Sequence, residues 1–379
     1  MKIALIVQSN WLEVHFGVRN LCMSLFKVLE QMGHDVEIVT FKQNTNQLLW
    51  YRIFVEDRLC KSIIKKTQLF NGQSYSALAR PPTEPIAHGL QFLGEGTLSG
   101  YDCCIFSNPW LLSTKVYLDT KQVICICHDV VANKYAFQRM GLKNISLLKW
   151  GFAHNSGYTF LKEIDAYFLS NSSKTDEEMS RFYGVNRHSY LPPVLPYPFF
   201  DLKTGAFKKE KAAILAAPFD PRKGFESMPA FLNALKEDLD VLYIFGRPRC
   251  QENLYKKFWK DLKVKKKIYF YEITSHDLIE LYKKCKILIF PSIEEGLGIP
   301  LLEAQACGCR VVTTNAKPMN ELALSGHYLL TGNFEKDILF AREMLRDESF
   351  DYESLSKEAS RRFSPNHVAS HLASIIGKD

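Results

Sequence analysis

Two acidic residues, Glu295 and Glu303, frame the stretch EGLGIPLLE with seven residues between them. Glycines at 296 and 298 lie in that gap, and glycine permits a positive φ and the close approach of a ligand to the backbone. Pro300 suits the first turn of a helix. Because the strand-like run KILIFPS precedes the stretch, we expect a strand, a glycine-bearing turn and a helix start, in that order.

This arrangement predicts two kinds of contact with one ligand. The free N–H groups and the dipole of a helix start attract an anion such as a phosphate. Carboxylates repel a phosphate and more readily accept hydrogen bonds from hydroxyl groups. A nucleotide sugar, which has both phosphates and hydroxyls, would use both features. The alternative is that the two acids only favour the helix N-terminus electrostatically.

The elements around this stretch alternate between strand-like and helix-like patterns. KIALIV, a helix-like run ending at Gly33, and DVEIVTF form a βαβ unit and so predict a parallel sheet. A proline-rich stretch near residues 192–210 indicates a linker, after which the βα pattern restarts. We predict two α/β domains, 1–195 and 196–360, followed by a C-terminal helix at 361–379. In such sheets ligands bind beyond the carboxyl ends of the strands.

Composition excludes several classes of protein. The net charge of +7 is spread along 379 residues, without the concentrated basic face of a nucleic-acid-binding protein. The sequence has neither a signal peptide nor an apolar run of 18 residues, so we expect a cytoplasmic protein without a membrane-spanning helix. None of the ten cysteines forms a C-x-x-C pair, and several lie in apolar runs. We expect small buried side chains in a reducing compartment and no zinc site.

The segment 50–66 allows two interpretations. It mixes aromatic and basic residues, so it could be a helix packed on the sheet with a solvated lysine face, or a peripheral contact with a membrane surface. The membrane contact would use Trp50, Tyr51, Arg52, Phe54, Lys61, Lys65 and Lys66.

FPSIEEGLGIPLLEAQACGCRVVTTNAKPMNEL resembles the signature of retaining glycosyltransferases of the family 4 (group 1) type. The resemblance implies the GT-B fold, two Rossmann-like α/β domains facing a central cleft, with a final helix that crosses back to the first domain. Glu295 and Glu303 match the E-x7-E pair of that family, and Glu321 matches a later acid. The match is poor between residues 42 and 100, a region that varies with the acceptor in this family.

The resemblance also implies a role for each matching residue. Glu295 would bind sugar hydroxyls and Glu303 the ribose, while the donor would also contact Gly296, Leu297, Gly298 and Ile299. Lys223 and Gly224 match an element that holds the donor diphosphate. Pro218 stands where the family has an arginine, and Arg222 is a candidate for the missing positive charge.

In the first domain, His128 directly follows the strand-like run QVICIC and matches a histidine that contacts the transferred sugar. Gly17 follows the first strand, where the family often has two glycines near the phosphates. His15 and Arg19 are weaker candidates. Asp238 and Asp240 form a D-x-D pair, but it precedes a strand, so we interpret it as a turn instead of a metal site.

The sequence therefore predicts a glycosyltransferase that needs neither a metal nor another cofactor. Its partners would be a nucleotide-sugar donor and a glycan or lipid-linked acceptor, as in the synthesis of bacterial surface polysaccharides. Two alternatives stay open, a nucleotide-sugar epimerase and a catalytically silent subunit that binds another glycosyltransferase. Pro218 and the single Gly17 favour the silent subunit mildly, whereas Lys223 and the two glutamates argue against it.

Overall fold

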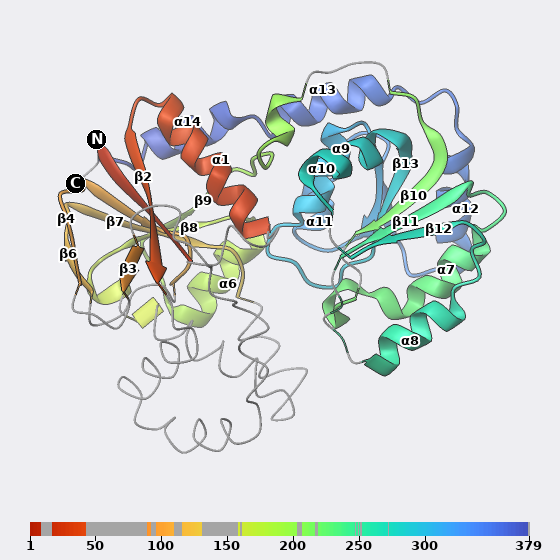
Figure 1. Ribbon diagram of the computed structural model, residues 1–379, viewed down its shortest axis with the longest axis horizontal. Coiled ribbons are helices and arrows are strands. Elements are labelled where there is room, and N and C mark those ends of the chain that lie inside the picture. Colours follow the sequence, from red (N-terminus) through yellow and green to blue (C-terminus); the bar gives the residue numbers. More distant parts are fainter. Residues whose placement is uncertain are drawn as a thin grey trace. The chain divides into compact units, whose positions relative to one another are not determined.

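The computed structural model describes residues 1–8, 17–42, 89–91, 96–109, 116–130, 158–159, 161–202, 207–216, 219–246, 248, 250, 252–271 and 273–377. The predictions for His15, Pro218 and segment 50–66 lie outside these residues. The chain divides into two compact units (Figure 1). The first comprises Met1–Pro193 and Asn366–Asp379, and the second Val194–Pro365. The division at 193/194 falls close to the predicted 195/196.

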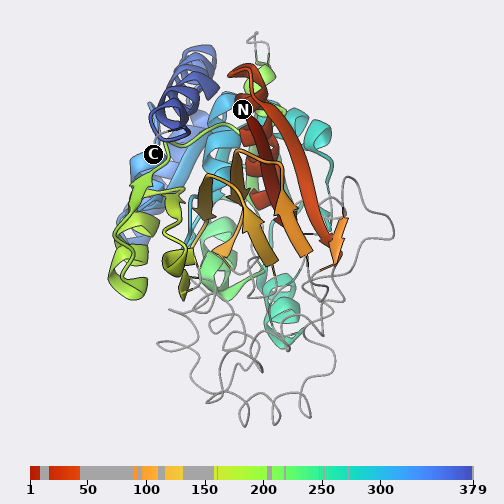
Figure 2. The same cartoon turned by 90° about the vertical axis from the view of Figure 1, so that its left-hand side faces the viewer.

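The first unit is built on a parallel sheet, as the βαβ pattern predicted (Figure 2). Its order among the described residues is β3-β2-β1-β5-β7-β8-β9. Helices α1 (Gly17–Gln31) and α6 (Ser173–Tyr183) follow β1 and β8, and a separate pair joins β4 (Gly96–Ser99) to β6 (Val116–Asp119). The strands are β1 (Lys2–Gln8), β2 (Asp35–Lys42), β3 (Gly89–Gln91), β5 (Cys103–Phe106), β7 (Gln122–Cys127), β8 (Tyr167–Ser170) and β9 (His188–Tyr190).

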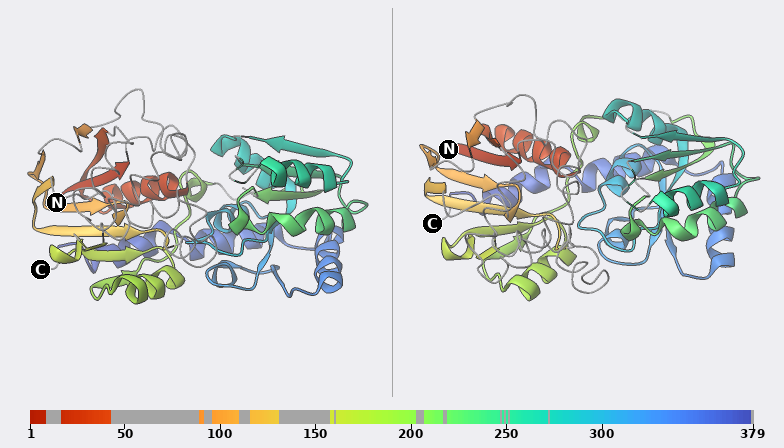
Figure 3. Two further views of the ribbon diagram at one scale, coloured as in Figure 1. Left: turned by 90° about the horizontal axis from the view of Figure 1, so that it is seen from below. Right: turned by 60° about the horizontal axis from the view of Figure 1, so that its bottom comes forward.

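The C-terminal segment belongs to the first unit, although the second unit precedes it in the chain (Figure 3). Helix α14 (Pro365–Ala373) carries His371, whose Nε2 lies 3.0 Å from Oγ of Ser189 on β9. Beyond the helix, the carbonyl of Ile375 accepts a hydrogen bond of 2.9 Å from the Gln122 side chain. These contacts hold the segment from residue 366 onward against the first sheet.

The second unit has the strand order β12-β11-β10-β13-β14-β15, and all its pairs are parallel. This is the doubly wound order, in which the direction of winding reverses between β10 and β13. The strands are β10 (Glu210–Ala216), β11 (Val241–Phe245), β12 (Lys267–Phe270), β13 (Cys285–Phe290), β14 (Arg310–Thr314) and β15 (Tyr328–Leu330). The helices are α7 (Met228–Ala234), α8 (Glu252–Asp261), α9 (Ser275–Lys284), α10 (Ile299–Ala306), α11 (Met319–Leu322), α12 (Phe334–Arg346) and α13 (Tyr352–Arg362), with short 3-10 turns at Phe199–Asp201, Pro221–Lys223 and Phe225–Ser227.

Alternate residues of the central strands supply two cores in this unit. On one face Ile214 and Leu288 pack with residues of α9, α10 and α13. On the other, Leu215 and Ile289 pack with residues of α7, α8 and α12. Side chains of a strand point to opposite faces in turn, so a strand covered on both sides is apolar throughout. This explains why these strands are continuous apolar runs in the sequence.

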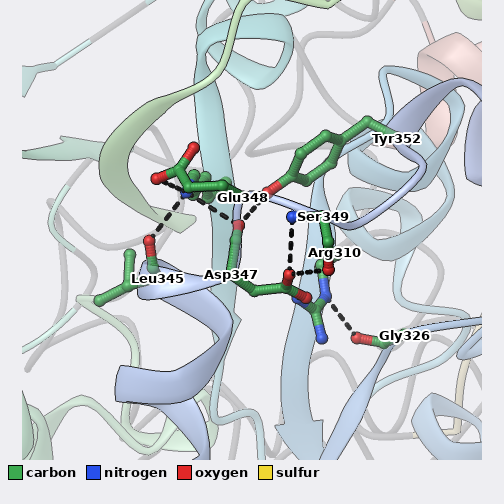
Figure 4. Close-up of polar contacts among 8 residues, drawn as sticks. Arg310, Gly326, Leu345, Asp347, Glu348, Ser349 and Tyr352 are labelled. Atoms are coloured by element: carbon green, nitrogen blue, oxygen red, sulfur yellow. Dashed lines mark hydrogen bonds and ion pairs between the residues drawn. The ribbon is translucent and has the colours of Figure 1, made fainter.

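Polar contacts fasten the segment after α12 to the start of the central strands. Arg310 at the start of β14 donates to the carbonyl of Gly326 at 2.9 Å and to the Asp347 carboxylate at 3.0 Å (Figure 4). The buried Lys286 of β13 donates to the carbonyls of Leu345 and Asp347 at 3.0 and 2.9 Å. These contacts lie at the amino ends of the strands, at the opposite edge of the sheet from the carboxyl ends.

The cysteines among the described residues are free, and all but the partly exposed Cys250 are buried, as expected. No described helix has the length and apolarity needed to cross a membrane.

Candidate functional site

The candidate site forms where the strand order of the second unit reverses. Strands β10 and β13 are parallel neighbours, with Ile214 beside Leu288. The turn at residues 220–224 follows β10, and the loop at residues 291–298 follows β13. Both therefore emerge at the same edge of the sheet, at the point where doubly wound proteins bind ligands. The Ile293 N–H donates to the Arg222 carbonyl at 2.7 Å and joins the two loops.

Asp220 and Gly224 shape the turn after β10. The Asp220 carboxylate accepts a hydrogen bond of 3.0 Å from the Arg222 N–H and caps the short 3-10 turn. Gly224 has a φ of +64°, in the left-handed region that favours glycine. A Cβ at residue 224 would overlap the carbonyl oxygen of Pro291. Glycine is therefore required here both for the turn and for the contact between the loops.

Lys223 and Glu295 meet across the two loops. The Lys223 Nζ donates to the Glu295 Oε1, and their side chains are only 14% and 10% exposed. The Nζ also lies 5.4 Å from the ring centroid of Phe290, the last residue of β13. The structure thus brings together two predicted site residues 72 positions apart in the chain.

Arg222 pairs with Asp220 instead of extending into solvent. Its Nε and Nη2 lie 3.3 and 3.2 Å from the two carboxylate oxygens. Burial alone would raise the pKa of Asp220, but the charge and hydrogen bonds of Arg222 hold it below the usual value. Asp220 was not among the predicted site residues. Its signal was an acidic residue directly before a proline, as at the cap of a helical turn.

The start of α10 has the predicted form. Gly298 caps the helix with a φ of +94°, and Pro300 follows in the first turn. Leu297 is buried in the core and Ile299 packs against it, so these side chains anchor the helix start. Gly296 lies in the loop before them. At this edge, the backbone N–H groups of the loop and the dipole of α10 can stabilise an anion.

Glu303 is a buried residue, and its predicted contact with the ribose stays a prediction. It is 4% exposed and lies on the second turn of α10. Burial raises the pKa of its carboxyl to about 8, and the nearby Tyr282 hydroxyl opposes that rise. Tyr282 is itself fully buried. Burial at this position therefore favours the neutral form of the Glu303 carboxyl.

Other predicted residues lie in different places. His128 directly follows β7 of the first unit and is 8% exposed, and Gly17 begins α1. Their predicted contacts with the donor stay predictions. In the second unit, Glu321 lies on α11 with its carboxylate 3.4 Å from Lys317. Glu294, next to Glu295, is a buried acid that was not among the predicted site residues.

The D-x-D pair is structural, as predicted. Asp238 follows α7 in a turn, and its carboxylate is 2.8 Å from Nε of Arg342 and 2.7 Å from Nε of Arg346. Two guanidinium groups occupy the oxygens that a metal would need. Among the described residues, no group of three or more His, Cys, Asp and Glu could hold a metal ion.

Comparison with known proteins agrees with this geometry. Residues 198–348 match the family described as glycosyl transferases group 1. These residues are therefore similar to group 1 glycosyl transferases. The match covers both loops of the candidate site, so Lys223 and Glu295 belong to it.

Three similar proteins extend the comparison. The serotype-specific mannosyltransferase WbdA of Escherichia coli is 37% identical over 105 residues, which are 27% of this chain and 13% of WbdA. The N,N'-diacetylbacillosaminyl-diphospho-undecaprenol alpha-1,3-N-acetylgalactosaminyltransferase of Campylobacter jejuni is 24% identical over 194 residues, 50% of each chain. The structure of WaaG, a glycosyltransferase involved in lipopolysaccharide biosynthesis, covers 100% of both chains with 16% identity and a TM-score of 0.61.

The likeness to WaaG shows a GT-B fold over the whole chain, as expected. The similarity to the family model is confined to residues 198–348. The chain spans at most half the length of the two curated relatives.

Proposed function

We propose that this protein is a retaining glycosyltransferase that moves a sugar from a nucleoside diphosphate sugar to a glycan or lipid-linked glycan. The observation that carries the proposal is the Lys223–Glu295 pair at the reversal point of the second sheet. One cation and one carboxylate stand side by side next to a helix start. Such a site suits a ligand with a diphosphate and hydroxyl groups close together.

Each residue has a distinct part in the proposed reaction. As the bond to the sugar breaks, negative charge develops on the leaving diphosphate, and Lys223 and the helix start at Gly298 stabilise it electrostatically. Glu295 accepts hydrogen bonds from the sugar hydroxyls and orients the ring. Glu303 holds the ribose, and His128 contacts the sugar from the first unit. The acceptor proton passes to a phosphate oxygen of the donor, so no protein side chain acts as general base.

The proposed acceptor follows from the relatives. The Campylobacter enzyme is named for a diphospho-undecaprenol acceptor, and WaaG is involved in lipopolysaccharide biosynthesis. We therefore place this protein in the synthesis of a bacterial surface polysaccharide, at the inner face of the cell membrane. Segment 50–66 is the proposed membrane contact.

The test begins with a panel of nucleotide sugars that includes GDP-mannose, UDP-glucose and UDP-N-acetylgalactosamine. Binding is measured by calorimetry, and transfer to undecaprenyl-linked glycans by mass spectrometry. Lys223→Ala and Glu295→Ala should each lower kcat/KM roughly 100-fold or more, as loss of an electrostatic contact to the transition state does. Absence of binding to every donor, or unchanged turnover in both variants, would refute the proposal.

Two further measurements address the reaction type. NMR of the product should show that the anomeric configuration of the donor is kept. Turnover should persist in EDTA, because Lys223 and the helix start take the part of a metal. Conversion of the donor without an acceptor would point instead to an epimerase, and loss of all donor binding to a silent subunit.

A further inference from the structure

The site of the second unit pairs its charged groups with one another. Lys223 is paired with Glu295, and Arg222 with Asp220. Two cations thus face two carboxylates. A diphosphate that enters must draw Lys223 toward itself while a carboxylate stays beside it.

The pair is held by backbone contacts as well as by its charges. The Ile293 N–H bonds to the Arg222 carbonyl at 2.7 Å, and Gly224 packs directly against the Pro291 carbonyl. Both side chains are mostly buried. Because the separation of a mostly buried carboxylate from its cation costs free energy, a replacement donor stabilises Glu295 when Lys223 turns to a phosphate.

A complete nucleotide sugar offers that replacement, whereas the bare nucleoside diphosphate does not. Sugar hydroxyls can donate to Glu295 and take the place of the Lys223 ammonium. After transfer the sugar has gone, and the remaining diphosphate faces a carboxylate of like charge.

We propose, on the basis of the proposed function, that Glu295 discriminates against the bare nucleoside diphosphate by competing with it for Lys223. The pair then has two consequences. It couples recognition of the diphosphate to recognition of the sugar, and it weakens binding of the product nucleotide once transfer is complete.

The experiment compares nucleotide with nucleotide sugar in the full chain. Calorimetry gives the Kd of UDP and UDP-glucose, and of GDP and GDP-mannose, for the wild type and Glu295→Gln. The variant keeps the size of the side chain but lacks its charge. It should bind the diphosphate roughly threefold to tenfold more tightly and the nucleotide sugar more weakly, so the ratio of the two Kd values shifts about tenfold or more.

Glu294→Gln is the matched control, since it removes a buried charge one residue away in the same loop. Its ratio should stay within about twofold of the wild type, because the Lys223 ammonium is paired with the Glu295 carboxylate. Glu295→Ala replaces the Gln variant if that one does not fold. The inference is overturned if the ratio is unchanged in both Glu295 variants, or if Glu294→Gln shifts it equally. In either case, donor binding by the wild type still supports the proposed function. If the wild type binds neither pair of ligands, both proposals fail together.

Discussion

Gln305 on α10 is bonded to Leu324 in the loop after α11. The Leu324 N–H donates to the Gln305 Oε1 at 2.6 Å, and Nε2 of the same side chain donates to the carbonyls of Leu301 and Leu322 at 2.8 and 3.0 Å. Gln305 is fully buried. One amide thereby fixes the helix that carries Glu303 to the segment that carries Glu321.

Replacement of this amide should destabilise the second unit. In Gln305→Met the side chain keeps its length, but the buried backbone groups of Leu322 and Leu324 lose their partner, at a cost of about 2–4 kcal/mol. Thermal unfolding should show a clear fall in Tm. The exposed Gln31→Met at the end of α1 is the control and should unfold like the wild type. Equal Tm values for the two variants would contradict the assigned role of Gln305.

Gly224→Ala should damage the turn that holds Lys223. Its φ of +64° and the overlap with Pro291 act together. Gly184→Ala is a matched control, because Gly184 has a φ of +60° with nothing within 4 Å of the added Cβ. Gly184→Ala should lower the free energy of unfolding by about 1 kcal/mol through backbone strain alone. Gly224→Ala should lower it by about a further 1–3 kcal/mol because of the overlap. Chemical denaturation measures both, and calorimetry should show weaker donor binding only in Gly224→Ala. A cost no greater than that of Gly184→Ala would show that the two loops separate easily.

The buried Glu303 should make stability depend on pH. Its pKa is about 8 in the folded protein against an ordinary 4.5, so between these values the folded chain keeps a proton that the unfolded chain loses. Stability therefore falls as pH rises through that range. Glu303→Gln removes this loss, and its advantage over the wild type should grow from pH 5 to pH 8 by an amount on the order of a few kcal/mol. The Tm of the wild type and of Glu303→Gln, measured at each pH, tests this prediction.

Glu237→Gln, at an exposed position, is the control for that series and should follow the wild type at every pH. If the difference between wild type and Glu303→Gln is the same at pH 5 and pH 8, Glu303 is ionised when buried, and its pKa is not raised.

Asp238→Asn should weaken the structure without affecting metal dependence. The substitution removes the charge that pairs with Arg342 and Arg346, and the carboxylate is only 6% exposed, so we expect a loss of about 1–3 kcal/mol. Asp240→Asn, at the exposed end of the same D-x-D pair, should change Tm little. Both variants should transfer sugar equally well with and without EDTA. If both variants lose activity and added Mg²⁺ or Mn²⁺ restores it, the D-x-D pair is instead a metal site.

Much of the second unit could be predicted from short-range patterns. The apolar run KILIFPS predicted β13 to within a few residues, because a strand buried on both faces has a distinct composition. The glycine at 298 and the proline at 300 predicted the start of α10, since each restricts or permits particular backbone angles. Asp238 and Asp240 were correctly assigned to a turn. These signals act over a few neighbouring residues.

The sequence by itself determined which side chains could do chemistry: Lys223 before a glycine, and Glu295 and Glu303 around a helix start. Only the tertiary structure decided how they are used. It pairs Lys223 with Glu295, turns Arg222 to Asp220, and buries Glu303. Such outcomes depend on which strands become neighbours and on how much water remains at each carboxylate. Charge pairing and desolvation act through space, so residue type and spacing cannot reveal them.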